Sequence, residues 1–127
     1  MEVICAVTLT EIQALHVKAF INRELEEFPK ASRKVIHFIA NFRYMQCKEE
    51  AVQALEYQFL HGYCYYFARM LQDSFGGDLY IVLNRCHIVW SPDGKYFYDI
   101  TGVCNGTINK NLVEKATPEQ CAAYKKL

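Results

Sequence analysis

The spacing of apolar residues changes once along the chain, at the pair Gly76-Gly77. Before this pair, apolar side chains recur every three or four residues, which is the period of an amphipathic helix. The pattern predicts helices over residues 9–26, 32–43, 48–57 and 62–75, preceded by a short strand over residues 3–7. Ser32 is predicted to cap the second of these helices. Two glycines in succession favour positive φ angles, so they are expected to end the fourth helix.

After Gly76-Gly77, runs of β-branched and aromatic residues predict three strands, over residues 79–84, 86–91 and 95–100. Helices followed by strands that are close in sequence favour an α+β fold, with the N-terminal helices and the 62–75 helix packed on a small antiparallel sheet. Residues 103–127 read as a loop and a short C-terminal helix, because Thr117 and Pro118 suit the N-cap and first helical positions.

The turn between the second and third strands sets their predicted register. In Ser91-Pro92-Asp93-Gly94-Lys95, the proline and the glycine suit a type I turn with a G1 bulge, which closes a loop of Pro92, Asp93 and Gly94. Pairing of Ser91 with Lys95 would then place His87 directly opposite Asp99, on the same face of the sheet. A two-residue loop would instead put these two side chains on opposite faces.

Length and composition favour a packed soluble protein. The chain has 127 residues, which predicts a single domain over 1–127, divided into a helical part (1–57), a core (58–102) and a C-terminal part (103–127). Lys+Arg and Asp+Glu both number 14, so the net charge argues against a nucleic acid or a membrane as the partner. No run of about 20 apolar residues and no basic leader is visible, so we expect a cytoplasmic protein. The six cysteines are widely spaced, which favours free thiols.

Cys64 carries the candidate chemistry. It opens the apolar 62–75 helix two residues after Gly62, and His87 and Asp99 follow on the predicted strands. A helix dipole and an imidazolium stabilise a thiolate, and a carboxylate orients the imidazole. The three residues therefore predict a nucleophilic Cys-His-Asp triad, although a cysteine on an apolar helix face also commonly fills a core.

This constellation resembles the papain-like and transglutaminase-like superfamily of thiol proteases, transglutaminases, deamidases and arylamine acetyltransferases. The segment 62–68 is similar to the nucleophile helix of those enzymes, and 87–90 and 98–102 resemble the His and Asp strands of the transglutaminase branch. The resemblance implies a cysteine-dependent hydrolase or acyltransferase, free of cofactors and metals. It would act on an amide bond of a protein or peptide, or on a small amide or acyl compound.

The same resemblance implies further site residues. Gln58 lies six residues before Cys64, the offset at which papain-like proteases keep an oxyanion-hole glutamine. Its amide and the Cys64 N–H would stabilise a developing oxyanion. Tyr63 and Tyr65 are candidates for lining a substrate groove, and His61 is a candidate substrate-side residue.

Two other functions stay open at this point. The first is a non-catalytic binding or inhibitor protein, of bacterial or phage type, with a degenerate papain-like fold. The second is a domain stabilised by zinc bound to Cys64, Cys86, His87 and Cys104. The sequence leaves the oligomeric state open.

Overall fold

The computed structural model describes residues 2–44 and 49–125. The chain divides into two compact units, Met1–Leu55 and Glu56–Leu127, and each is described by itself. The helix α3 (Glu49–Leu60) crosses this boundary. The single domain expected from the chain length stays a prediction.

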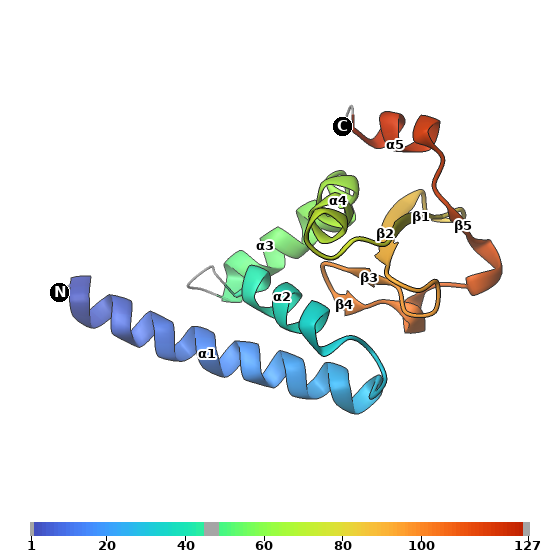
Figure 1. Ribbon diagram of the computed structural model, residues 1–127. Helices are drawn as coiled ribbons and strands as arrows, with labels where there is room; N and C mark the ends of the chain where they lie inside the picture. Colours follow the sequence, from blue (N-terminus) through green and yellow to red (C-terminus); the bar gives the residue numbers. More distant parts are fainter. Residues whose placement is uncertain (1, 45–48, 126–127) are drawn as a thin grey trace. The chain divides into compact units, whose positions relative to one another are not determined.

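The first unit contains a helical hairpin, in which α1 (Glu2–Glu27) and α2 (Arg33–Arg43) pack against each other (Figure 1). The side chain of Ser32 accepts a hydrogen bond from the backbone N–H of Val35 at 3.3 Å, so the predicted cap of α2 is confirmed. The strand predicted over residues 3–7 is wrong, because these residues form the beginning of α1. A continuous helix satisfies their backbone groups locally, whereas a strand needs a partner.

In the second unit, α4 (Cys64–Phe75) packs on the sheet, mainly against its central strand β2 (His87–Ser91) (Figure 1). The helix begins at Cys64 and not at residue 62 as predicted, because Gly62 has a φ angle of +152° and Tyr63 is the N-cap. The buried residues of α4 are Cys64, Phe67, Ala68 and Leu71. The helix ends as predicted at Gly76, whose φ angle is +75°.

The sheet has five strands in the order β4-β3-β2-β1-β5, and all neighbouring strands are antiparallel. Besides β2, the strands are β1 (Asp78–Val82), β3 (Tyr98–Asp99), β4 (Gly102–Val103) and β5 (Val113–Lys115). The predicted α+β class is confirmed. The strands β4 and β5 lie in the region that we predicted to be a loop, and Cys86, predicted as a strand residue, instead precedes β2 with a φ angle of +48°.

The predicted register of the β2–β3 hairpin is wrong by two residues, since Trp90 pairs with Tyr98 and not with Tyr96. In the loop, a side chain hydrogen-bonds to backbone N–H groups that a shorter hairpin would pair between its two strands. Oδ1 of Asp93 accepts hydrogen bonds from the N–H groups of Lys95 and Tyr96, at 2.8 and 3.1 Å. The predicted loop of three residues is therefore longer, and β3 is only two residues long. Gly94 has the predicted positive φ angle, +74°.

The segment after β4 contains two short 3₁₀ helices, Asn105–Thr107 and Lys110–Leu112, before β5. The predicted C-terminal helix is confirmed as α5 (Pro118–Lys125). Its capping box has Gln120 N donating to Thr117 Oγ1 at 3.1 Å and Thr117 N donating to Gln120 Oε1 at 2.8 Å. Among the described residues, no helix is long and apolar enough to cross a membrane.

Candidate functional site

Two residues of the predicted triad are in direct contact. His87 is the first residue of β2, Asp99 is the last residue of β3, and His87 Nε2 lies 2.9 Å from Asp99 Oδ2. The error of two residues in the predicted register does not separate them, because an even shift keeps each side chain on its face of the sheet. His87 and Asp99 are therefore neighbours on one face, as predicted, but they are not directly opposed.

A threonine that the sequence reasoning missed holds the carboxylate. The backbone N–H of Thr101 donates to Asp99 Oδ1 at 2.8 Å, and the hydroxyl of Thr101 donates to the same oxygen. One carboxylate oxygen is thus held by Thr101 and the other binds His87. The signal was present in the sequence, since a threonine two residues after an aspartate is typical of an Asx turn.

Cys64 reaches the same strand from α4. As the first residue of that helix, it lies where the helix dipole stabilises negative charge. The backbone N–H of Ile88, the residue after His87, donates to Cys64 Sγ at 3.4 Å. This contact directs the sulfur toward β2 at the position of the imidazole.

The electrostatics of His87 link the three residues. Its Nδ1 atom is buried and has no hydrogen-bond partner among the described residues. Burial lowers the pKa of His87, but the hydrogen bond with Asp99, the interaction of the ring with the Cys64 sulfur and the negative charge of both groups outweigh this effect and raise the pKa to about 9. The imidazole is therefore held between a carboxylate and a thiol, and its protonated form is favoured.

The site is enclosed. Cys64 is 4 % exposed, His87 2 % and Asp99 5 %. On this side of the unit α5 packs against α4, and Tyr124 of α5 is half-buried. Burial, the charges of Cys64 and Cys86 and a hydrogen bond to Cys86 raise the pKa of Tyr124 to about 12. Tyr124 is thus hydrogen-bonded to Cys86 and within electrostatic range of Cys64, and nothing in the local sequence predicted this.

The other predicted site residues lie around the start of α4. Gln58 is exposed in α3, and its backbone carbonyl accepts a hydrogen bond from Tyr63 N at 3.1 Å. Its side-chain amide has no hydrogen-bond partner among the described residues. Tyr63 is 47 % exposed, and the ring of His61 lies 4.3 Å from that of Tyr57, between ring centroids. No contact joins Gln58, His61 or Tyr63 to His87 or Asp99 in the part of the chain described.

Tyr65 lines a small hollow of about 260 Å³ in the second unit, between α4, β1, β5 and α5. The hollow is polar at its edges, with Arg69 of α4 and Lys115 of β5 among its lining residues. The predicted binding role of Tyr65 stays a prediction.

The four described cysteines for which pairing is defined, Cys64, Cys86, Cys104 and Cys121, are free thiols. The side chains of Cys5 and Cys47 lie outside the described residues. No group of three or more His, Cys, Asp or Glu side chains that could hold a metal ion occurs within the described parts of the chain. The residues of the zinc alternative are therefore not gathered into a metal site.

Comparisons with protein-family models, with curated proteins and with solved structures find no match to this chain.

Proposed function

We propose that this protein is a cysteine-dependent hydrolase or acyltransferase that acts on an amide bond through Cys64, His87 and Asp99. The observation that carries the proposal is the state of the His87 imidazole. One ring nitrogen binds a buried carboxylate, and the other is buried without a hydrogen-bond partner among the described residues, on the strand that Cys64 contacts. A buried polar atom without a partner is costly, and a proton exchanged with Cys64 would satisfy it.

The proposed reaction begins with proton transfer from the thiol of Cys64 to His87 Nδ1, which gives a thiolate and an imidazolium. The sulfur then attacks the carbonyl carbon of the amide, and the carbonyl electrons move to the oxygen. As the C–N bond breaks, the imidazolium returns its proton to the leaving amine and a thioester on Cys64 remains. Water or a second amine, deprotonated by His87, cleaves the thioester and restores the thiol.

Asp99 and Thr101 act as positioning groups in this scheme. Asp99 binds Nε2 of the imidazole, so Nδ1 is the nitrogen available to the sulfur. Thr101 restrains the carboxylate through its other oxygen. The exposed amide of Gln58 and the N–H of Cys64 are the proposed oxyanion donors, as the resemblance to papain-like enzymes implies.

The test is site-resolved alkylation of the folded protein with iodoacetamide across pH, read by mass spectrometry. We expect Cys64 to react at about pH 7, where an ordinary thiol with a pKa of about 8.5 is largely protonated. The variant His87→Ala should remove this reactivity. Cys104, which is also buried, is the internal control for accessibility. Equal, slow labelling of Cys64 and Cys104 at pH 7 would contradict the proposal.

A second readout detects the covalent intermediate. Incubation with p-nitrophenyl acetate should transfer an acetyl group to Cys64 in the wild type, visible in the intact mass and mapped by peptide digestion. Cys64→Ala should abolish the transfer without unfolding the protein. Acetylation that persists unchanged in His87→Ala would show ordinary thiol chemistry and no triad.

A specific observation favours one other candidate, a non-catalytic binding protein. All three triad side chains are almost fully buried, as they would be in a degenerate site that serves only the core. In that case Cys64→Ala would retain the full biological effect. Both labelling experiments would then fail at Cys64 in the wild type.

A further inference from the structure

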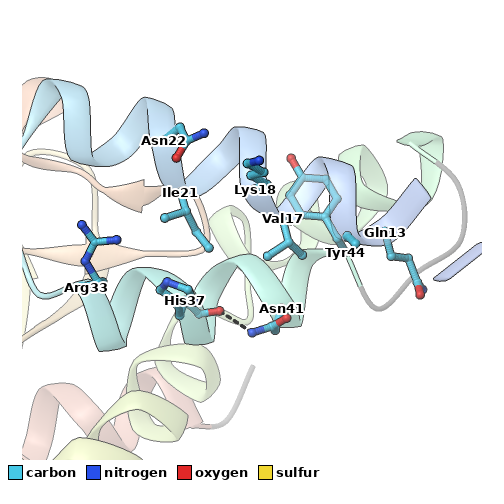
Figure 2. Close-up of a pocket in the computed structure, with 10 residues that line it drawn as sticks. Gln13, Val17, Lys18, Ile21, Asn22, Arg33, His37, Asn41 and Tyr44 are labelled. Atoms are coloured by element: carbon cyan, nitrogen blue, oxygen red, sulfur yellow. Dashed lines mark hydrogen bonds between the residues drawn. The ribbon is translucent and has the colours of Figure 1, made fainter. Parts of the chain in front are cut away.

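A groove of about 560 Å³ follows one side of the helical hairpin of α1 and α2 (Figure 2). Its lining residues all belong to these two helices or to Tyr44, the C-cap of α2. The groove is therefore a feature of the first unit alone. It is separate from the proposed triad, which lies in the second unit.

The floor of the groove is apolar. Ala14, Val17 and Ile21 line it from α1, at a spacing of three and four residues that places them along one stripe of the helix. Along this stripe Ala14 is exposed and Val17 half-buried, whereas Ile21 is only 6 % exposed and forms the deepest part of the floor. Figure 2 shows Val17 and Ile21 pointing toward α2. An apolar stripe between two helices is the surface on which a third helix packs, with its side-chain ridges in the groove.

The rim of the groove is basic. Lys18 and Arg33 line it, are exposed, and have no carboxylate partner among the described residues. The other polar lining groups are His37, the hydroxyl of Tyr44 and the amides of Gln13, Asn22 and Asn41, and no Asp or Glu is among the described lining residues. Two cations without counter-charges beside an apolar floor are complementary to an amphipathic surface that carries carboxylates.

The length of the groove favours a short helix. From Gln13 to Asn22 the groove follows ten residues of α1, which span about 13 Å at a rise of 1.5 Å per residue. That length matches two to three turns of a docked helix. A docked helix satisfies its own backbone groups, whereas an extended peptide in a groove between helices would find no strand edge to pair with.

We infer that this groove is the docking site for an acidic amphipathic helix of a partner protein. The apolar face of that helix would pack on Val17 and Ile21, and its carboxylates would pair with Lys18 and Arg33. The inference is independent of the proposed catalysis.

The test uses the full-length protein and a fluorescent synthetic peptide of about three helical turns, with Leu at helical spacing and Glu at the flanking positions. Fluorescence anisotropy at low salt should show saturable binding. The double variant Lys18→Glu, Arg33→Glu should weaken binding at least about tenfold, since two attractions become repulsions. Lys34→Glu is the matched control, because Lys34 is exposed on α2 but does not line the groove. It should bind like the wild type.

The floor is tested with a second matched pair. Val17→Asp should abolish binding, whereas Leu15→Asp should not, because Leu15 is 68 % exposed on α1 and lies outside the groove. Should Val17→Asp unfold by circular dichroism, NMR shift mapping on the wild type replaces it. The peptide should then shift the amide resonances of Val17, Ile21 and His37.

Several outcomes would overturn the inference. They are equal binding of a control peptide with Lys in place of Glu, unchanged binding by the double charge-reversal variant, and shift changes confined to other residues. Self-association that the double variant abolishes would identify a second copy of the chain as the occupant. Adsorption to phosphatidylserine vesicles that the same variant abolishes would identify a lipid surface. None of these results depends on activity at Cys64.

Discussion

At the scale of single residues, His87 concentrates the chemistry of the second unit. Its Nε2 atom is paired with Asp99, and Asp99 is itself restrained by Thr101, so the ring has one defined orientation. The neutral ring presents Nδ1 as an acceptor, and the protonated ring donates from both nitrogens. Because Asp99 and Cys64 favour the protonated form, the charge of His87 is coupled to the stability of the fold.

This coupling gives a prediction for stability against pH. The pKa of His87 rises from 6.5 to about 9 on folding. The stabilisation that His87 contributes to the free energy of unfolding is therefore fully present below pH 6.5 and is lost as the pH rises through about 9. The lost contribution should be about 3 kcal/mol. Urea unfolding followed by the fluorescence of Trp90 should show this loss between pH 6 and pH 10 in the wild type.

The variant His87→Gln has no imidazole at this position, so the loss of unfolding free energy between pH 6 and pH 10 should be absent. This holds whether the variant is more or less stable than the wild type. His37→Gln, which changes an exposed histidine in the first unit, is the control and should keep the wild-type slope. Parallel pH profiles for the wild type and His87→Gln would refute the link between His87 and folding.

At the scale of elements, the junction between α4 and β1 positions α4, which carries Cys64, on the sheet. The indole N–H of Trp90 donates to the carbonyl of Gly76 at 2.7 Å, which ties the end of α4 to β2. Gly77 has a φ angle of +78°, and a Cβ atom there would lie 2.7 Å from the carbonyl oxygen of Ser91. The close approach of helix and strand thus requires glycine at this position.

The two glycines of this junction should respond differently to alanine. Gly76→Ala should cost about 1–2 kcal/mol of unfolding free energy, because its φ angle is positive but its Cβ would meet no atom within 4 Å. Gly77→Ala should cost a further 1–3 kcal/mol or so, because the clash is with backbone that cannot move freely. Urea denaturation of both variants measures the difference, and equal losses would be inconsistent with the close approach.

At the scale of the second unit as a whole, the candidate site is assembled from a helix and two strands and is then closed. The sulfur of Cys64 comes from α4, His87 from β2 and Asp99 from β3. The helix α5 packs against α4, and Tyr124 of α5 is hydrogen-bonded to Cys86 and within electrostatic range of Cys64. A substrate therefore needs access that the burial of Cys64 does not provide, and Tyr124 is the group to change first.

Truncating Tyr124 should make the thiol more accessible. We expect Tyr124→Ala to speed alkylation of Cys64 by about tenfold or more, because loss of the ring loosens the packing of α5 on α4, the helix that carries Cys64. Tyr124→Phe keeps the ring and loses only the hydroxyl, so it should label Cys64 at nearly the wild-type rate. Cys104, buried elsewhere in the core, controls for general loosening. A uniform increase at both cysteines would show global destabilisation and not local uncovering.

Local sequence determined the features that depend on only a few neighbouring residues, namely helix caps and the end of α4. The Ser32 cap, the Thr117–Gln120 capping box and the glycine stop after α4 were all predicted, because their hydrogen bonds and φ angles depend on near neighbours. The alternation of side chains along the strands also predicted that His87 and Asp99 lie on one face of the sheet. This stayed correct because the observed register differs from the predicted one by two residues, and a shift of two residues keeps each side chain on its face.

Only the tertiary structure decided the remaining features, because they depend on groups that are distant in the sequence. Asn105 accepts a hydrogen bond from Phe97 N at 2.8 Å and thereby helps to hold the loop that displaced the predicted register. Residues 3–7 continue a helix in place of the expected strand. The burial of Cys64 follows from the packing of α4 on β2, where the N–H of Ile88 meets its sulfur, and the electrostatic effect of Cys64 on Tyr124 follows from the packing of α5 on α4. No local pattern in these elements encodes either contact.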